Sequence, residues 1–584
     1  MSNGELNPKL STMETRIAVL MTIVAACWTS RADLATPAKS GFAAVSGTFY
    51  VNTNADLLNL GNPSQHTGVD IAANGNIMIG WENDGSPGIT DFEAVWTLYT
   101  PNGTPLISPT VQTNRDVSGN GECGTSYESV TSPWLSFFRD DNTPIGGYTG
   151  WGGYFPKANR FGNGIGSGAF CYETGLEILE LADINGASGG DFGVVQLLNN
   201  DGTPFRPGVI NGLTNLGILS FTETDVAPSG NLWAADFDYL ANGNIVVAGM
   251  SEKDGDWDLT GQTDGYVPVY RVWTPGGVPV HDYAAASSEP IGGDLIRGVG
   301  VTANGFALRW NQEHGGNATM RLFDNAGNPT STNINLATLT GHPEVASGGN
   351  GSGGDVGQGS GFHGNGVDAY VYANSGGTPG TPWVTVINAD GTLRWSREVQ
   401  DDSDPIDTST VADLDAAIDP SGRVIVVFSS PAATNVDGTV YSLTQARLFD
   451  KTGKPLGPRF VVSEIENQAT TTEYPFTIDS ALEPRVAWRG NNVAFVWLSQ
   501  SSPGNWQFPV VAARVLAAPI TLTSVSHTGT TTTINWTGGT PPYSLQRKNP
   551  LTGSWSIVKT GITGTTTTYI DSVTQAYYQV LCSQ

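Results

Sequence analysis

A unit of four short strands joined by glycine-containing turns recurs along this chain and limits the folds that it can adopt. The unit is clearest at residues 412–463, where ADLDAAIDPSGRVIVVF is followed after a loop by QARLFDKTGKPLGPRFVV. Its apolar runs and turn residues predict four strands, at residues 413–418, 423–428, 445–449 and 458–462. An all-β chain built from small repeated sheets is therefore expected.

Both halves of this unit return at regular intervals. A turn that precedes an apolar strand returns at Gly75, Gly243 and Gly305, and a strand that ends in a glycine turn returns at Gly103, Gly202, Gly277, Gly327, Gly391 and Gly453. A period of roughly 45 to 75 residues with four strands per unit is typical of a β-propeller, whose blades stack because none can bury its faces alone. The units fall at about 64–110, 128–208, 228–285, 291–337, 354–400, 409–465 and 476–516. They predict a seven-bladed β-propeller over residues 41–516.

The seventh unit stops near residue 516 without an outer strand. A segment of the same style, residues 48–52, lies at the other end of the repeats. An open ring would expose an unpaired sheet edge. We therefore expect residues 48–52 to pair with residues 510–516 and to close the ring.

The charge balance restricts the partners of this chain. Asp+Glu number 54 against 27 Lys+Arg, which gives a formal net charge of −27. A surface of this sign repels nucleic acid and anionic lipid. We expect no nucleic-acid binding.

An apolar run at residues 17–28 follows Arg16 and is too short to span a bilayer. It has the form of a secretion signal covering residues 1–32, with Met13 as a second candidate start and cleavage after Ala32. Residues 24–27 also match a bacterial lipoprotein box, so a lipid anchor at Cys27 is the alternative, and no transmembrane segment is predicted. In an oxidising compartment Cys123 and Cys171 are expected to form a disulfide.

The sixth unit, at residues 422–428 and 446–457, resembles the repeats of secreted bacterial β-propeller proteins. The resemblance implies this fold and an extracellular setting, and it brings no shared catalytic residues. After Pro519 the sequence becomes rich in threonine, and its strands at 533–536, 543–547, 568–571 and 576–580 resemble those of a fibronectin type III domain with Trp536 in its core. A small β-sandwich is expected at residues 519–584.

Acidic residues recur on one face of the predicted first strands. Asp70, Asp236, Asp238 and Asp415 alternate with apolar residues at period two, so they share the face turned to the ring axis. Small residues at neighbouring positions fit a close approach of the blades there. The carboxylates could bind a cation or ligand in a channel, or they could accept backbone hydrogen bonds or pair with Arg485.

Two further groups could bind a ligand. Asp254, Asp256 and Asp258 alternate in one loop and could converge on Ca²⁺, although the pattern of an EF-hand is incomplete and a solvated acidic loop is the alternative. Tyr148, Trp151, Tyr154 and Phe155 lie among glycines in the second unit. On a surface loop they could stack on sugar rings, and alternatively they pack as a small satellite core.

These features favour a secreted or cell-surface binding or adhesion protein without catalytic activity, whose partner is an extracellular polymer, such as a glycan, or a cell-surface ligand. A polysaccharide lyase or glycosidase on the same scaffold is the first alternative, because a propeller fold does not decide between binding and catalysis. A structural component of a surface layer or matrix is the second. No catalytic residue and no cofactor other than Ca²⁺ is predicted.

Overall fold

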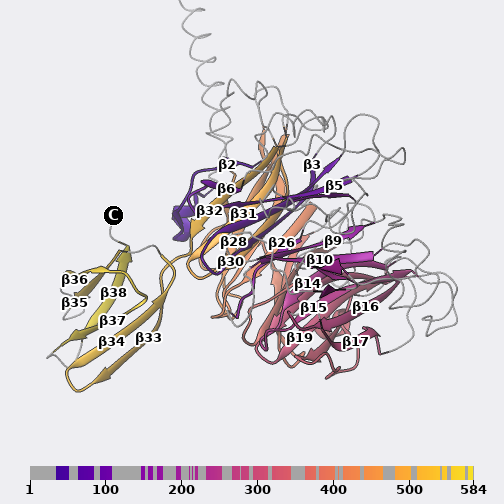
Figure 1. The fold of residues 1–584 in the computed structure, drawn as a ribbon. Helices are drawn as coiled ribbons and strands as arrows, with labels where there is room; N and C mark the ends of the chain where they lie inside the picture. Colours follow the sequence, from indigo (N-terminus) through magenta and orange to yellow (C-terminus); the bar gives the residue numbers. More distant parts are fainter. Residues whose placement is uncertain are drawn as a thin grey trace, which may run out of the picture.

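Strands account for nearly all regular structure in the computed structural model of this chain (Figure 1). Among the described residues only a short 3-10 helix, η1 (Pro37–Ser40), and one α-helix, α4 (Leu336–Thr340), interrupt them. The structure describes residues 35–51, 64–84, 92–107, 147–150, 155–161, 168–174, 192–198, 209–210, 213–214, 218–220, 232–252, 266–275, 278–288, 294–312, 318–342, 362–376, 381–400, 406, 412–434, 440–463, 480–500, 510–539, 542–548, 554–571 and 576–582.

Antiparallel sheets of four or five strands follow one another along the described chain. The first sheet contains β3 (Ser64–Ile71), β4 (Ile77–Asp84), β5 (Phe92–Tyr99), β6 (Pro105–Ile107) and β7 (Gly147–Gly150). The second contains β8 (Phe155–Lys157), β9 (Gly168–Thr174), β10 (Phe192–Leu198) and β13 (Ile218–Ser220), with the hairpin β11 (Val209–Ile210) and β12 (Leu213–Thr214) apart from it. The third contains β14 (Leu232–Tyr239), β15 (Ile245–Glu252), β16 (Tyr266–Trp273) and β17 (Pro279–Ala285).

The remaining sheets repeat the same order. The fourth contains β18 (Asp294–Thr302), β19 (Gly305–Gln312), β20 (Thr319–Asp324) and β21 (Ile334–Asn335), and the fifth β22 (His363–Gly364), β23 (Ala369–Gly376), β24 (Thr381–Asn388) and β25 (Leu393–Glu398). The sixth contains β26 (Ala412–Ile418), β27 (Val424–Thr434), β28 (Val440–Phe449) and β29 (Phe460–Val461), and the seventh β30 (Ser480–Arg489), β31 (Asn492–Gln500) and β32 (Val510–Ala517). In the sixth sheet β27 and β28 are longer than the sequence predicts, because they continue to pair as far as Thr434 opposite Val440, where a loop is expected.

The sheets lie in a circular order. The first strand of each contacts the first strand of the next from β14 through β18, β22 and β26 to β30, and β30 contacts β3. Contacts of β8 with both β3 and β14 complete the circle. Apolar residues fill the spaces between adjacent sheets; one cluster joins Ile79 and Trp81 of the first sheet to Val496 and Val511 of the seventh. This arrangement is that of a β-propeller-like protein.

The N-terminal segment supplies the outer strands of the seventh sheet, as the sequence predicts. Both β1 (Ala43–Ala44) and β2 (Phe49–Tyr50) pair with β32, with Phe49 opposite Ala513 and Tyr50 opposite Ala512. The Val51 N–H continues the pairing by donating to the Val511 carbonyl at 2.8 Å. Further upstream, Ala35 forms a parallel bridge with Phe460 of the sixth sheet.

A repeated contact joins four of the outer strands to the following sheet. In four sheets the turn between the third and fourth strands contains a glycine at φ between 82° and 93°, namely Gly103, Gly327, Gly391 and Gly453. A Cβ on these glycines would lie 2.6–2.8 Å from a side chain of the preceding sheet, namely Phe49, His281, Ile334 and Trp395 respectively. Phe49 thus makes, from the N-terminal segment, the contact that fourth strands make elsewhere.

The two faces of the ring differ in their connections. We call the turn face the side on which the first strand joins the second and the third joins the fourth; its turns close by bonds such as Gly75 N–H to Ala72 and Gly453 N–H to Asp450. The opposite side is the loop face, where longer connections leave. There β9 ends at Thr174 while β10 begins at Phe192, and β29 ends at Val461 while β30 begins at Ser480.

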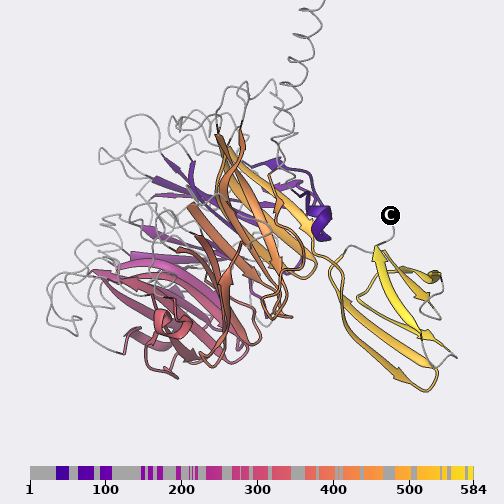
Figure 2. The same ribbon diagram turned by 180° about the vertical axis from the view of Figure 1, so that it is seen from behind.

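The C-terminal residues form two three-stranded sheets that project from the ring (Figure 2). One contains β33 (Thr521–Thr528), β34 (Thr531–Thr537) and β37 (Thr566–Ile570), and the other β36 (Ser556–Ile562), β35 (Tyr543–Lys548) and β38 (Tyr577–Cys582). They share a core in which Trp536 is 1% exposed, as its predicted role requires. Arg423 of the sixth sheet anchors them by donating to the Pro519 carbonyl and the Thr521 hydroxyl at 3.0 and 2.8 Å.

Candidate functional site

The acidic residues predicted to face the axis lie on first strands and are buried. Asp70 is on β3, Asp236 and Asp238 are on β14, and Asp415 is on β26. Their exposed fractions are 6%, 1%, 3% and 2%. Carboxylates this deeply buried need hydrogen-bond partners within the protein.

Backbone N–H groups of the next sheet provide partners for three of the four, whereas Asp238 accepts from the N–H of Tyr239 at 2.8 Å. Asp236 accepts a bond from Val299 N at 2.7 Å, and Asp415, at the equivalent position, accepts one from Val486 N at 2.8 Å. Asp70 likewise accepts from Ala158 N at 2.8 Å. A carboxylate of one first strand therefore fixes the first strand of its neighbour.

Close backbone approach accompanies these bonds. A Cβ on Gly300 would lie 2.9 Å from Tyr370 Cδ1, and one on Gly364 would lie 1.9 Å from the Val301 carbonyl oxygen. The fourth and fifth sheets can meet there only because both positions are glycine. This agrees with the predicted use of small residues near the axis.

A lysine and a histidine contact the acidic residues. Lys157 Nζ lies 3.1 Å from Asp236 Oδ2, and His363 Nε2 lies 3.2 Å from Asp415 Oδ1. Burial opposes the charge on Lys157, but attraction to Asp236 and Asp238 outweighs it and leaves the lysine pKa raised. Burial also raises the pKa of Asp238 to about 6, although the charges of Lys157 and Arg160 act in the opposite direction.

The segment that follows β8 crosses the axis at the turn face. The Asn159 carbonyl accepts a bond at 2.7 Å from Arg489, whose other terminal nitrogen donates to Ile71 at 3.1 Å. Phe161 packs on the core shared by the third and fourth sheets, and it lies near Gly366 in a turn of the fifth. These contacts reach sheets on opposite sides of the ring, so the segment fills the axis at this end.

The backbone hydrogen bonds to Asp70, Asp236 and Asp415 are of the kind that the second of the two sequence interpretations expects. No cluster of three or more His, Cys, Asp or Glu suited to a metal ion occurs among the described residues. Pairing with Arg485 is the other form of that interpretation. Arg485 Nη1 donates to the Pro484 carbonyl at 3.0 Å, and no ion pair joins Arg485 to an axial carboxylate in the described part of the chain. Among the described residues, these bonds link neighbouring sheets at the axis.

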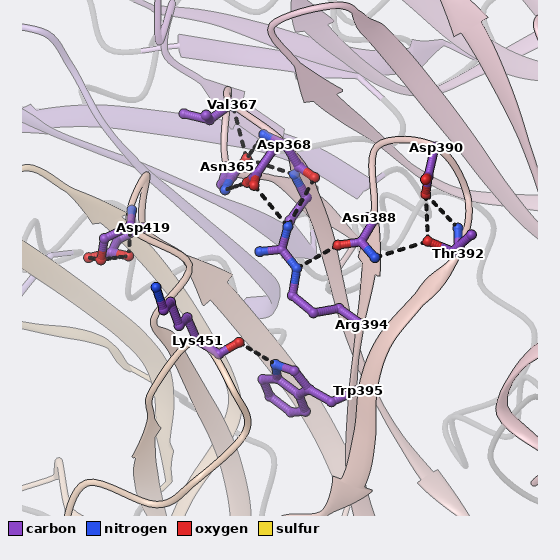
Figure 3. Close-up of polar contacts among 12 residues, drawn as sticks. Asn365, Val367, Asp368, Asn388, Asp390, Thr392, Arg394, Trp395, Asp419 and Lys451 are labelled. Carbon is purple, nitrogen blue, oxygen red and sulfur yellow. Dashed lines mark hydrogen bonds and ion pairs between the residues drawn. The ribbon is translucent and has the colours of Figure 1, made fainter.

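A polar network on the turn face likewise links structural elements. Arg394 of β25 donates to Asn388 Oδ1 at 2.7 Å and to Asp368 Oδ2 at 2.9 Å (Figure 3). Trp395 beside it donates to the Lys451 carbonyl of the sixth sheet at 3.1 Å. The network ties two turns of the fifth sheet to each other and to the next sheet.

The predicted aromatic insertion needs a correction. Tyr148 lies in β7, which pairs with β5 of the first sheet opposite Val95, and not in the second unit. Phe155 begins β8, the first strand of the second sheet, opposite Cys171, so it is not on a surface loop. Trp151 and Tyr154 lie outside the described residues, as do Asp254, Asp256, Asp258, Cys123 and residues 1–32 with Cys27.

Sequence reasoning missed the cations that organise the axis and the junction. Lys157, Arg489 and Arg423 each bond to residues that are distant in sequence. Their only sequence signal is a cation inside or beside a strand in a chain with few charges. That signal does not identify the partner.

Comparisons with known proteins give structural likenesses of low similarity. No family model matches the chain, and no curated protein matches it. A protein of unknown function from Dyadobacter fermentans is 11% identical with a TM-score of 0.32, covering 82% of this chain and 99% of that one. An α-L-arabinofuranosidase from Fusarium graminearum is 8% identical with a TM-score of 0.32, covering 78% and 93%. A polysaccharide lyase is 9% identical with a TM-score of 0.36, covering 77% and 89%.

These likenesses are too distant to assign an activity, and the β-propeller-like arrangement rests on the circular order of the sheets. The non-catalytic interpretation of the sequence stays a prediction. Among the described residues, no helix is both long and apolar enough to cross a membrane.

Proposed function

We propose that the chain is a secreted seven-bladed β-propeller, closed by its N-terminal strand and followed by a fibronectin type III-like β-sandwich. The circular order of sheets and the position of Phe49 against Gly103 support the closed ring. The core shared by β34, β35, β36 and β38 supports the sandwich. In this proposal residues 1–32 direct export, with lipidation at Cys27 as the alternative.

We propose further that the protein binds an extracellular polysaccharide through the loop face. The observation that carries this proposal is the asymmetry between the faces: outside the second sheet, tight turns occupy most of one face, and most of the long connections leave the other. Binding residues occur most often on long loops that a rigid scaffold positions. The axial acids are buried, and the polar groups of the turn-face network bond to one another. The loop face is therefore the better candidate for ligand binding.

The end of β7 and the start of β8 both lie at the loop face, and two of the predicted aromatic residues fall between them in the sequence. Because β7 is antiparallel to β5, it runs toward the loop face, where it ends at Gly150, and β8 starts there at Phe155. The connection between these ends contains Trp151 and Tyr154. Aromatic rings at such a position offer apolar faces on which sugar rings stack.

The test compares wild type with Trp151→Ala and Tyr154→Ala on a glycan array, with Trp395→Ala as the control for an aromatic residue on the turn face. We expect the first two variants to lose roughly tenfold in affinity, since about 1.4 kcal/mol corresponds to a factor of ten and an aromatic contact contributes on that order. Unchanged binding, or a wild-type protein that binds no glycan, would refute the proposal.

Catalysis on the bound polymer is the alternative function, and the same preparation tests it. Release of reducing ends indicates a glycosidase, and a gain of absorbance from unsaturated uronic acid indicates a lyase. Binding with neither product supports the binding function. Assembly into sheets or filaments without any ligand would instead support a structural role.

A further inference from the structure

We propose that the C-terminal module has a polysaccharide-binding site of its own on the outer face of the sheet β36-β35-β38, specific for chains that contain uronic acids. The site is separate from the loop face of the ring, and it does not depend on the function proposed there. Its residues are Trp555, Ile557, Lys548, Gln546, Tyr577 and Gln579.

Strand register defines this outer face. Leu545 of β35 lies opposite Val580 of β38, and both are buried in the module core. The residues next to them therefore face outward: Gln546 lies opposite Gln579, and Lys548 lies opposite Tyr577. On the other side of β35, Ile557 of β36 lies opposite Gln546, and it alternates with Val558, which packs on the core.

These residues form two rows across the sheet. In the first row, Lys548 lies between Trp555 and Tyr577, with its Nζ 5.8 Å from the centre of the indole ring. In the second row, Gln579 donates to Gln546 Oε1 at 2.6 Å, and Ile557 lies beside them. One face therefore combines two aromatic rings, a cation and two amides.

The apolar members of this surface are exposed. Trp555 is 40% exposed, Ile557 60% and Tyr577 44%. The outer face of the other sheet differs, since β34 and β37 present mainly threonines such as Thr533 and Thr568, which lie opposite each other. That sheet also exposes Leu522, Val525 and Ile570, but among the described residues the exposed tryptophan and tyrosine rings of the module lie on the sheet β36-β35-β38 side. A surface that groups exposed aromatic rings with Ile557 indicates an interaction site.

The spacing of the rings fits a polysaccharide chain. Two strand separations of about 4.8 Å place the edge strands about 10 Å apart. Trp555 immediately precedes one edge strand, β36, and Tyr577 begins the other, β38. A disaccharide unit of an extended glycan spans a comparable distance, so alternate sugars can stack on the two rings. Amides in the second row can donate to and accept from hydroxyl groups.

Charge selects among such chains. The proposed site contains one charged residue, Lys548. The module as a whole has Arg547, Lys548 and Lys559 against Asp571. Its net charge is thus +2, which leaves −29 for the rest of the protein. The module projects from the acidic ring (Figures 1 and 2), and charges beyond about 8 Å are screened at physiological salt. A carboxylate between the two stacked sugars would meet the Lys548 ammonium.

The experiment is affinity electrophoresis of the full chain in native gels that contain alginate or polygalacturonate, with the neutral glucan pullulan in parallel. We expect the uronic acid polymers to retard the protein and pullulan to leave it unretarded. Trp555→Ala and Tyr577→Ala should each weaken retardation roughly tenfold. Lys548→Gln should reduce retardation by the uronic acid polymers.

Ile570→Ala is the matched control, because Ile570 is 74% exposed on the other sheet. This variant should migrate as the wild-type protein does. Trp555→Phe keeps an aromatic ring and should retain most of the binding. Equal retardation by pullulan, unchanged migration of Trp555→Ala, or a loss of the same size with Ile570→Ala would overturn the proposal. Trp151→Ala leaves this site intact, so failure at the loop face and failure here are distinguishable.

Discussion

Replacing Gly103 by alanine tests whether the N-terminal segment closes the ring in solution. Gly103 has a φ of 82°, and an added Cβ would lie 2.7 Å from Cδ1 and 3.1 Å from Cγ of Phe49. The left-handed conformation costs an alanine about 1–2 kcal/mol, and crowding a packed contact costs about 1–3 kcal/mol more. Gly103→Ala should therefore lower the free energy of unfolding by roughly 2–5 kcal/mol.

A second glycine separates the two costs. Gly75 has a φ of 89°, but its Cβ would meet only Pro101 Cγ at 3.6 Å, which is an ordinary contact. Gly75→Ala should therefore lose only the conformational part, about 1–2 kcal/mol. Both glycines belong to turns of the first sheet on the turn face, so the pair is matched in surroundings.

A double-mutant cycle then isolates the contact with Phe49. Phe49 is half-buried, so Phe49→Ala should cost about 2 kcal/mol, less than a fully buried phenylalanine. In the Phe49→Ala background the added methyl has space, and Gly103→Ala should cost no more than Gly75→Ala. We expect a coupling energy of about 1–3 kcal/mol from urea unfolding. Additive losses would mean that Phe49 does not lie against Gly103, and the argument for closure would fail.

Three further results are expected. Burial raises the pKa of Asp238 from 3.8 to about 6, so between these values the folded chain retains a proton that the unfolded chain loses. The free energy of unfolding should therefore fall as pH rises from 4 to 6, by on the order of 3 kcal/mol. Asp238→Asn should flatten this fall in urea titrations, and an unchanged slope would contradict the prediction. Arg423→Met removes the bonds to Pro519 and Thr521, so limited proteolysis should cleave faster near residue 519, whereas Arg459→Met serves as the control. Mass spectrometry of a non-reduced digest should find Cys123 linked to Cys171, and free thiols at both would disprove the disulfide.

Local chemistry explains which parts of the fold are predictable from the sequence. Asp450 accepts bonds from the N–H groups of Thr452 and Lys454, so the turn of the sixth unit is specified within five residues and its sequence indicates it directly. The short strand β8 has no comparable local signal. It is held by pairing with β9 and by the Lys157 bond to Asp236, residues that are 79 positions apart.

The axial acids illustrate the same limit. Alternation correctly places Asp236 and Asp415 on first strands, because period two is a local property. Whether their carboxylates bind a ligand or a backbone N–H depends on the distance to the next sheet, and only the fold determines it. The exposed face of the C-terminal module is not predictable from the sequence for a similar reason. Trp555 and Tyr577 share one face only because β35 pairs with β36 on one side and with β38 on the other.

The N-terminal strands also constrain the order in which the chain can fold. The Ser46 hydroxyl accepts a bond from Val515 N across 469 positions of sequence. Contacts of such long range form late, because the loop-closure entropy must be lost before they contribute. During synthesis the first repeats are complete long before residues 510–517 exist, so segment 43–51 must wait unpaired until nearly the whole chain has emerged. The closing contacts of the ring are therefore the last to become possible, and a chain that stops before β32 cannot make them.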